Sequence, residues 1–591
     1  MSDDNKPIES ALVADIGSTL THVCLIDQVE GIYRLIACAS APTTAYGAEG
    51  DITIGLRRAI EKIERIAQRP LLNREGEPIS PEQDTGEGTD IFLATSSAAP
   101  PLECIIVGLT NDLSIQSAQR ACATANAIVT HTIALGARGR RWDKKTLALL
   151  HQSPPDVILM VGGVDTGPTA PLESAARVLA NIYEDINPEQ RPVIVFAGNQ
   201  EARRPVAAIL GEGFDLRVVD NVRPNAHIES PGELQRELSD LYSQNKLATL
   251  PGYRRLRRWC SSAILSSSEA LSITLRFIAR RNKLPQGVLG IDVGGNTTYV
   301  GAARSEMYQW ATSPNMGTSY GLRHVVKESG LRDIRRWLPF PMQTRELVSY
   351  LENASLRPQG VPQTMEDLLI LHALARQALL LTMRRIRGQF WVGEDALMRT
   401  TPPFDLLAAR GGLLSHTVQD GLTVLTILDA AQPTGLIRLV IDWASLWPQL
   451  GALAQVAPLA AAQVLERDGF RELGTIIAPI GEARDGDRAL HLRIIRQDGQ
   501  VTEADIPAGT IRRFPLGLNE QATVEVRPSR HFDIGLGRKG LGGKAQVRGG
   551  SLGIIIDTRG RPLGLPQDAR RRRAKLQEWL GSLIHDDNSS S

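Results

Sequence analysis

The chain has 591 residues, of which 42 % are hydrophobic and 22 % charged, and its formal net charge is +1. This length is enough for two to four domains, and the composition is that of a folded globular protein. A charge so close to neutral excludes a global field that would draw the chain to nucleic acid or to an anionic membrane. We therefore expect no nucleic-acid partner and no membrane partner.

The ends and the cysteines predict a cytoplasmic protein. The N-terminal stretch MSDDNKPIES is polar and acidic, unlike a secretory signal. No apolar run approaches the ~20 residues that a membrane span needs. The cysteines form no CxxC pair, which is typical of buried free thiols in a reducing compartment. They are Cys24, Cys38, Cys104, Cys122 and Cys260.

Residues 10–90 read as the first part of an α/β domain. Three short strands, ALVADI, LTHVCLI and YRLIACA, are followed by an amphipathic helix over 52–68. The segment 71–90 is rich in proline, glycine and acidic residues, which predicts an exposed loop.

Residues 91–225 predict an α/β insertion. The apolar runs IFLAT, ECIIVGL, DVILMVGG and PVIVFAG alternate with helical segments, as in a parallel sheet covered on both faces. Asp165, in VGGVDTG, follows one of these strands at the sheet edge that ligands favour. A glycine-rich turn there is also common without a ligand, so both interpretations stay open for Asp165.

Residues 226–430 predict a helical region and a second α/β domain. The segment 230–282 is helical and basic, which favours a solvated helix face over a docking surface. The pattern of the N-terminus then returns in GVLGIDVGGNTTYVGAAR, residues 287–304. Helices are expected over 321–355 and 363–388, and a further strand ends before Gly411 and Gly412.

Short alternating runs separated by turns predict a β domain over 465–565, followed by a basic helix and tail over 566–591. GLGRKG, at 535–540, fits G-x-G-x-x-G. We reject a dinucleotide site there because the glycine-rich stretch that follows cannot begin a helix.

The turn after the first strand has the chemistry of a phosphate site. Gly17 has no side chain to obstruct a ligand, and the N–H and hydroxyl groups of Ser18 and Thr19 can face phosphate oxygens. Asp15 cannot bind phosphate directly, but it can hold Mg²⁺ through water. We predict that Asp15 binds a hydrated metal ion.

A second turn of the same kind strengthens this hypothesis. Asp292 could hold the metal or polarise an attacking water, so Asp15 and Asp292 are the predicted catalytic and metal-binding residues. The turn itself could clasp the same phosphates, and the flat pair Gly411-Gly412 could accept a purine face. The second turn's predicted contacts are Gly294, Gly295, Asn296 and Thr297.

These three motifs resemble the phosphate-1, phosphate-2 and adenosine motifs of the superfamily that contains actin, sugar kinases and heat-shock chaperone ATPases. The resemblance covers roughly residues 10–430. It implies duplicated RNase-H-like (actin-like ATPase) domains, with ATP or ADP and Mg²⁺ in the cleft between them. Two departures are visible: Asn296 replaces a glycine that many chaperones carry, and Arg410 precedes the glycine pair where a small residue is common.

A closer resemblance is to the MutL family associated with glutamate mutase, which shares only its name with a DNA mismatch-repair protein. It rests on the strings DIGST, APTTAYGAEGDITIGLRRAI, ATSSAA, LMVGGVDTG, VIVFAGN, DNVRP, IDVGGNTT and NMGTSYGL. The resemblance implies a chaperone or reactivating factor that serves a subunit of an adenosylcobalamin-dependent mutase by ATP-driven exchange of damaged cobalamin. A weak ATPase activity is expected.

Two alternatives stay open. One is a small-molecule kinase of the same superfamily, in which Asp292 would face an acceptor hydroxyl. The other is a non-catalytic scaffold with a vestigial nucleotide cleft, against which the intact Asp-Gly-Ser/Thr sets argue. The sequence has no D-x-H-x-x-G motif, which argues against a histidine-bound corrinoid, and it leaves the oligomeric state open.

Overall fold

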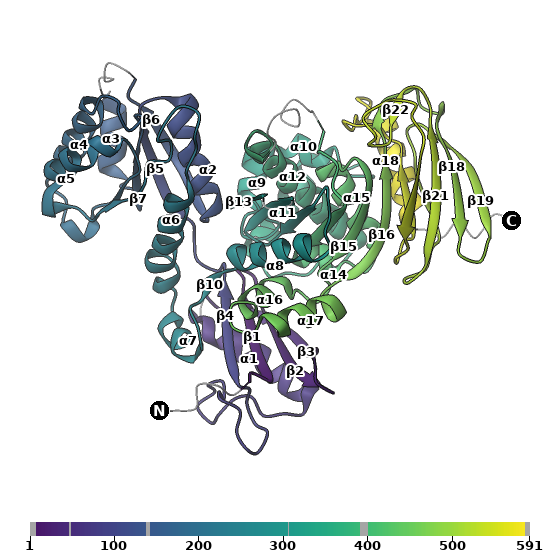
Figure 1. Cartoon of the computed structure of the whole chain (residues 1–591), viewed down its shortest axis with the longest axis horizontal. Helices are drawn as coiled ribbons and strands as arrows, with labels where there is room; N and C mark the ends of the chain where they lie inside the picture. The colour runs from purple at the N-terminus through teal and green to yellow at the C-terminus, as the bar shows by residue number, and fades with distance from the viewer. Residues whose placement is uncertain are drawn as a thin grey trace. The chain divides into compact units, whose positions relative to one another are not determined.

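The computed structural model describes residues 7–46, 49–136, 142, 144–304, 307–390 and 400–584. The chain divides into two compact units (Figure 1). Unit 1 consists of Met1–Ala98 and Arg254–Ser591, and unit 2 is Ala99–Tyr253. A short helix, α7 (Tyr253–Trp259), begins at the boundary.

The first sheet of unit 1 has the strand order β10-β4-β1-β2-β3. The central strand β1 pairs antiparallel with β2 and parallel with β4. The strands are β1 (Ser10–Ile16), β2 (Leu20–Val29), β3 (Ile32–Pro42), β4 (Ile91–Ser96) and β10 (Leu265–Ser266). The three strands expected at the N-terminus are confirmed.

Helix α1 (Ile52–Ala67) packs on this sheet through an apolar stripe, as its periodicity predicts. Its N-terminus is capped by Asp51, whose carboxylate accepts a hydrogen bond from the N–H of Thr53 at 2.8 Å. The predicted loop at 71–90 contains no helix and only one isolated bridge, between Leu72 and Pro78.

The second sheet of unit 1 repeats the arrangement of the first. Its order is β13-β12-β11-β14-β15-β16-β24-β20, and β11 pairs antiparallel with β12 and parallel with β14. This repeat confirms the prediction of duplicated RNase-H-like domains. The strands are β11 (Val288–Val293), β12 (Thr297–Arg304), β13 (Met307–Pro314), β14 (Leu406–Arg410), β15 (Gly435–Ile441), β16 (Arg471–Ala478), β20 (Ile511–Phe514) and β24 (Ile554–Asp557).

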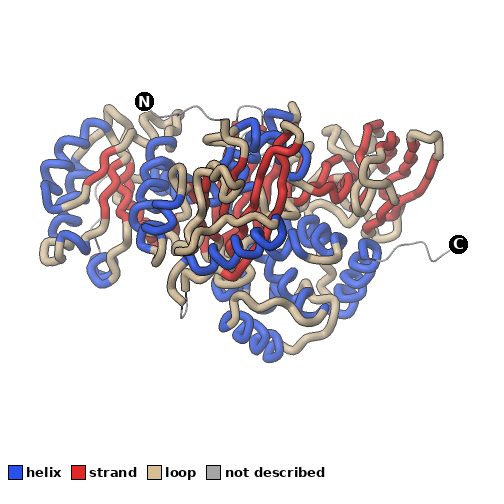
Figure 2. The backbone as a smooth tube through the Cα atoms, turned by 90° about the horizontal axis from the view of Figure 1, so that it is seen from below, coloured by secondary structure: helices blue, strands red, loops and turns tan. Residues whose placement is uncertain are grey.

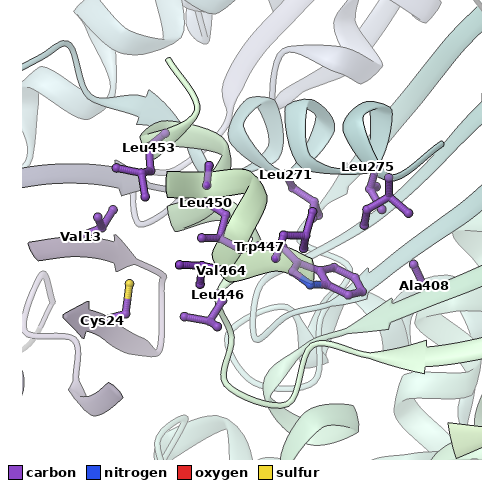
Figure 3. Packing of buried hydrophobic residues seen from close by; sticks show 14 of the residues in the cluster. Val13, Cys24, Leu271, Leu275, Ala408, Leu446, Trp447, Leu450, Leu453 and Val464 are labelled. Atoms are coloured by element: carbon purple, nitrogen blue, oxygen red, sulfur yellow. The ribbon is translucent and has the colours of Figure 1, made fainter. Parts of the chain in front are cut away.

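One hydrophobic core joins the two sheets. Helices α8 (Ser267–Arg281) and α16 (Trp447–Leu453) pack against each other, and both contact strands of the first sheet. Figure 3 shows the Trp447 side chain of α16 within this core. The core includes Val13 and Cys24 from the first sheet and Ala408 from the second, so removing this apolar surface from water holds the two halves together.

The helical segments expected in the second domain are present. Those over 321–355 form separate helices, divided at Gly330 and after Arg335, whereas the segment over 363–388 is one helix, Met365–Phe390. The helices are α9 (Leu322–Ser329), α10 (Leu331–Arg335), α11 (Thr344–Leu356), α12 (Met365–Phe390), α14 (Gly412–His416), α15 (Asp420–Ala431) and α17 (Pro458–Asp468).

The predicted β region over 465–565 is not a separate sheet system. Strands β16, β20 and β24 extend the second sheet, and a four-stranded sheet of order β19-β18-β21-β23 packs on them through a common apolar cluster. Alternation of apolar residues predicts strands but not the sheet they join, which explains the difference. The remaining elements are β17 (Ile480–Gly481), β18 (Arg488–Arg496), β19 (Val501–Pro507), β21 (Gln521–Pro528), β22 (Phe532–Asp533), β23 (Gly543–Arg548) and α18 (Ala569–Ile584).

Unit 2 is a five-stranded parallel sheet of order β6-β5-β7-β8-β9. Helices cover both of its faces (Figures 1 and 2). It begins and ends later than the expected insertion at 91–225, because β4 pairs with β1 in the first sheet and α6 packs on α2. Its elements are β5 (Leu102–Gly108), β6 (Ala127–Ala134), β7 (Val157–Val161), β8 (Val193–Phe196), β9 (Leu216–Val218), α2 (Gln116–Thr124), α3 (Lys144–Gln152), α4 (Ala170–Ile182), α5 (Arg203–Leu210) and α6 (Gly232–Asn245).

All five cysteines are free thiols, and only Cys38 is partly exposed. Burial raises the pKa of Cys24, and it raises the pKa of Cys260 to about 12. At Cys104 the pKa is raised mainly by a hydrogen bond with Cys122 and secondly by burial. Within the described ranges, no helix combines the length and the apolar character that crossing a bilayer requires.

Candidate functional site

The two predicted phosphate turns are built in the same way. In the first, between β1 and β2, the N–H of Gly17 donates to the carbonyl of Leu20 at 3.0 Å. In the second, between β11 and β12, the N–H of Gly294 donates to the carbonyl of Thr297 at 2.9 Å. The equivalent hydrogen bonds show that the repeat extends from the sheets to the turns.

The structure brings these two turns into contact. A methyl group placed on Gly295 would lie 2.1 Å from Oγ1 of Thr19, so only glycine fits there without displacing the first turn. Oγ1 of Thr19 is shielded from solvent and has no hydrogen-bond partner in the described part of the chain. Leaving a buried hydroxyl without a partner costs about 1–3 kcal/mol, so a ligand or water that supplied one would be stabilised here.

Four backbone N–H groups in the turns remain available to a ligand. Within the described residues, the N–H groups of Ser18, Thr19, Gly295 and Asn296 donate no hydrogen bond. Consecutive free N–H groups in tight turns make concave anion sites. These N–H groups belong to two turns that are in contact, since Gly295 lies against Thr19.

The loop NMGTSYGL supports the second turn from behind. The N–H of Thr318 donates to the carbonyl of Gly294 at 3.1 Å, and the N–H of Ser319 to that of Gly295 at 2.8 Å. Gln359 crosses to the first domain, where its Nε2 donates to the carbonyl of Thr43 at 2.8 Å. The last hydrogen bond links the second domain to the strand end beside the first turn, because the N–H of Thr43 donates to the carbonyl of Thr19 at 2.9 Å.

A single arginine joins the predicted catalytic carboxylates. Nη2 of Arg410 donates to Oδ2 of Asp15 at 2.7 Å, and Nη1 donates to Oδ2 of Asp292 at 2.7 Å. Nε of Arg410 forms an ion pair with Oδ2 of Asp442 at 3.2 Å. The Arg410 side chain is only 9 % exposed, so these interactions take place largely out of water.

The repeat of the fold explains why Arg410 is there. In the first sheet, Asp15 lies opposite Thr95 of β4, and Oγ1 of Thr95 donates to Oδ1 of Asp15 at 2.9 Å. In the second sheet, Asp292 lies opposite Arg410 of β14. Arg410 thus occupies the position equivalent to Thr95, and its longer side chain reaches both aspartates.

Two further residues of the site were not found by sequence reasoning. Oγ of Ser267, at the start of α8, donates to Oδ1 of Asp15 at 2.6 Å. Asp442 follows β15, and its two oxygens accept the N–H groups of Leu446 at 2.7 Å and Trp447 at 3.0 Å. Asp442 thus binds the N–H groups at the start of α16 from the preceding loop. An aspartate a few residues before a helix is the only signal of this role in the sequence.

Burial and charge oppose each other at these groups. Burial raises the pKa of Asp292 although Arg410 acts against it, and burial raises the pKa of Asp442 to about 6. Burial also disfavours the charge on Arg410, but Asp292, Asp15 and Asp442 together raise its pKa. The guanidinium is therefore a permanent positive charge at the centre of the site.

The aspartates as placed do not fit a metal ion shared between them. Both oxygens of Asp15 already accept hydrogen bonds, from Thr95 and Ser267 on one side and Arg410 on the other. The guanidinium lies where a bridging ion would contact both carboxylates. Among the described residues, no group of three or more metal-ligating side chains is arranged to hold an ion.

Of the two glycines predicted to contact a purine, only Gly412 has free space beside it. A methyl group on Gly411 would lie 2.2 Å from the carbonyl oxygen of Val293, so this glycine is required for packing of β14 on β11. Gly412 has open space beside it at the start of α14. Nearby, the rings of His22 and His416 stack at 6.2 Å, a contact that sequence reasoning missed. Burial lowers the pKa of His22 to about 4, which keeps it neutral at physiological pH.

Asp165 in unit 2 has a structural explanation. Its Oδ1 accepts hydrogen bonds from the N–H of Gln200 at 3.1 Å and from Nδ2 of Asn221 at 2.9 Å. These bonds tie together the loops that follow three neighbouring strands. The ligand contact considered for Asp165 stays an untested prediction.

Comparisons with known proteins give one family and several distant folds. A sequence profile of the family described as MutL protein matches residues 11–468. The chain is 24 % identical to "Protein MutL" of Clostridium tetanomorphum over 497 residues, which cover 78 % of this chain and 99 % of that protein.

Similar solved structures include nucleotide-free acetone carboxylase, with 13 % identity, a TM-score of 0.35, and coverage of 85 % of this chain and 81 % of that one. Glycerol kinase of Plasmodium falciparum with ADP has 9 % identity, a TM-score of 0.31, and coverage of 78 % and 93 %. Component A of (R)-2-hydroxyglutaryl-CoA dehydratase of Acidaminococcus fermentans has 10 % identity, a TM-score of 0.27, and coverage of 77 % and 99 %. Scores this low carry no functional argument.

Proposed function

The chain belongs to the MutL protein family, and from this premise we propose that it binds ATP or ADP between its two glycine turns and hydrolyses ATP slowly. The observation that carries the proposal is the meeting of the turns. Each has an Asp-x-Gly sequence, each is closed by the same hydrogen bond, and together they leave four N–H groups without acceptors in the described chain.

The turns supply what a polyphosphate needs. Backbone N–H groups are strong donors to phosphate oxygens and require no side chain. Gly295 permits close approach, and Oγ1 of Thr19 would gain the partner that it lacks. Because Thr19 and Gly295 touch in the present arrangement, a phosphate that enters between them must separate the turns.

Hydrolysis would depend on Asp292. Its Oδ2 accepts from Arg410, and no donor of the described chain reaches its Oδ1. A carboxylate oxygen that is held on one side and open on the other can orient a water for attack on the terminal phosphate. Phosphoryl transfer depends mostly on positioning and charge stabilisation, so one oriented water gives a slow reaction without a stimulating partner.

We propose as partner a subunit of an adenosylcobalamin-dependent mutase, for which the chain would act as a reactivating factor. The support is the family and the motif resemblance that carries it. Nucleotide-driven separation of the turns would change the relation of the two sheets of unit 1, and a change of that kind can be transmitted to a bound protein.

A thermal unfolding experiment tests the nucleotide proposal. ATP that binds only the folded chain should stabilise it by ~2.7 kcal/mol at a concentration of about 100 times its Kd, which raises the melting temperature by a few degrees. Adenosine, which lacks phosphates, is the matched ligand control and should give a much smaller shift. No shift with ATP at any concentration up to millimolar would contradict the proposal.

A further inference from the structure

We propose that the guanidinium of Arg410 is the resident cation of this site, so that the chain binds the polyphosphate of a nucleotide without a divalent metal ion. The inference rests on the proposed nucleotide function and deepens it. It states that the nucleoside triphosphate binds equally well with or without a metal ion on its phosphates.

The first argument is position. A metal ion shared by Asp15 and Asp292 would have to lie between their carboxylates, and Arg410 already bridges them with two hydrogen bonds of 2.7 Å each. The two aspartates come from different sheets of unit 1, and the guanidinium is the positive group common to both. Its positive charge balances the two carboxylates, as a metal ion would otherwise do.

The second argument is the saturation of Asp15. Its Oδ1 accepts from Thr95 at 2.9 Å and from Ser267 at 2.6 Å, and its Oδ2 accepts from Arg410. The carboxylate is only 5 % exposed. A metal ion, or a water from its hydration shell, would have to displace at least one of these donors and expose it unpaired, which is costly in a buried site.

The third argument is that Arg410 has N–H groups that the aspartates do not use. A guanidinium carries five N–H groups in a fixed plane, and each terminal nitrogen of Arg410 uses one of its two for an aspartate. The second N–H on Nη1 and on Nη2 can therefore be donated to phosphate oxygens. Arginine matches such oxygens in pairs, whereas a hydrated metal ion contacts them individually.

The fourth argument is that Arg410 is held in place. Its Nε pairs with Asp442 at 3.2 Å, and Asp442 is itself fully buried and held by the backbone N–H groups of Leu446 and Trp447. A cation held by three carboxylates is already oriented before a phosphate arrives. This is what distinguishes it from a surface arginine.

Calorimetric titration of the full-length chain with ATP tests the inference, once with excess Mg²⁺ and once with excess EDTA. We expect the two dissociation constants to differ by less than about threefold. A loss of affinity in EDTA of about tenfold or more would overturn the inference while leaving the proposed function intact. Absence of binding in both buffers would overturn the proposed function and this inference with it.

The variant Arg410→Gln provides the second readout. Without the guanidinium, the aspartates can accept a metal ion, so ATP binding by this variant should become dependent on Mg²⁺. A merely structural arginine would lower affinity equally in both buffers, and that outcome would overturn the inference. If Arg410→Gln does not fold, Arg410→Lys, which keeps the charge, is titrated instead and should remain independent of Mg²⁺.

The matched control is Arg438→Gln. Arg438 lies on β15 opposite Leu406, at the other end of β14 from Arg410, and pairs with Glu472 of β16. It undergoes the same chemical change and loses one ion pair, but it has no contact with the two turns. Its titrations in Mg²⁺ and EDTA should match those of the wild type.

Discussion

Replacing Arg559 with leucine is expected to lower the free energy of unfolding by about 3–5 kcal/mol, the range measured when one partner of a buried ion pair is removed. Arg559 is fully buried and binds two aspartates. Its Nε and Nη2 donate to the two oxygens of Asp557 at 2.9 Å each, and its Nη1 donates to Asp429 at 2.6 Å. The substitution leaves both carboxylates short of a donor, and both are fully buried.

The charges around Arg559 explain why the effect should be large. Burial opposes ionisation of Asp557, yet Arg559 and Arg561 together keep its pKa below the usual range. The guanidinium also lies over the ring of Trp579 at 4.7 Å, which ties α18 to the network. Removing Arg559 therefore weakens the contact of the C-terminal helix as well as the ion pairs.

Urea-induced unfolding followed by circular dichroism measures the effect. The control is Arg323→Leu, because Arg323 pairs with Glu352 at 2.9 Å but both side chains are more than half exposed. An exposed pair contributes about 0.2–1 kcal/mol. If the two variants lost equal stability, the buried network would not contribute as its geometry indicates.

Replacing Gly295 with alanine is expected to weaken ATP binding by about 100-fold, or ~2.7 kcal/mol. The new methyl group would lie 2.1 Å from Oγ1 of Thr19 and would occupy the space where a phosphate must approach the second turn. Calorimetric titration with ATP measures the change. Gly564→Ala is the control, since nothing lies within 4 Å of its added methyl group, and its affinity should stay that of the wild type.

A second substitution tests the steric contact between the turns separately from the effect on ATP affinity. Thr19→Ala removes Oγ1, after which the nearest atoms to the methyl group at 295 are side-chain carbons of Thr19 and Ser319 at 3.2 Å. In a double-mutant cycle, stability lost in Gly295→Ala should be largely recovered when Thr19→Ala is added. Additive effects of the two substitutions would contradict the contact between the turns.

The sequence predicted the features that depend on local chemistry. The two Asp-x-Gly turns were visible because glycine and small hydroxyl residues between apolar runs determine a turn wherever they occur. The return of the same pattern at Asp292 supported the resemblance that implied duplicated domains, and the two sheets have the same central strand order. The resemblance to the MutL family rested on these turns together with further strings such as LMVGGVDTG and VIVFAGN.

The features that depend on strand pairing were not predictable. Arg410 was noticed only as an unusual residue before a glycine pair. Its role depends on the register that places it opposite Asp292, 118 residues away, and within reach of Asp15, 395 residues away. The burial of Arg559 and Arg561 was missed for a different reason. Arginine is normally exposed, and nothing in the local sequence shows that two aspartates will be buried beside them.

The boundaries of the domains were displaced for the same reason. Strand β4 is as apolar as the strands that follow it, and only its pairing with β1 places it in the first sheet rather than in unit 2. Likewise, β16, β20 and β24 alternate like the other C-terminal strands but join the second sheet. Hydrophobic periodicity determines the type of an element and leaves its neighbours undetermined.

The central claim is that one nucleotide is held by both turns together, and hydrogen–deuterium exchange of the full-length chain with and without ATP tests it most directly. Four N–H groups of the turns have no acceptor in the described chain, those of Ser18, Thr19, Gly295 and Asn296. Without ATP, these groups should exchange rapidly. We predict that ATP slows exchange in the peptides covering 17–19 and 294–296 at the same ligand concentration. Protection of only one of these peptides, or of neither while ATP is bound, would contradict the account.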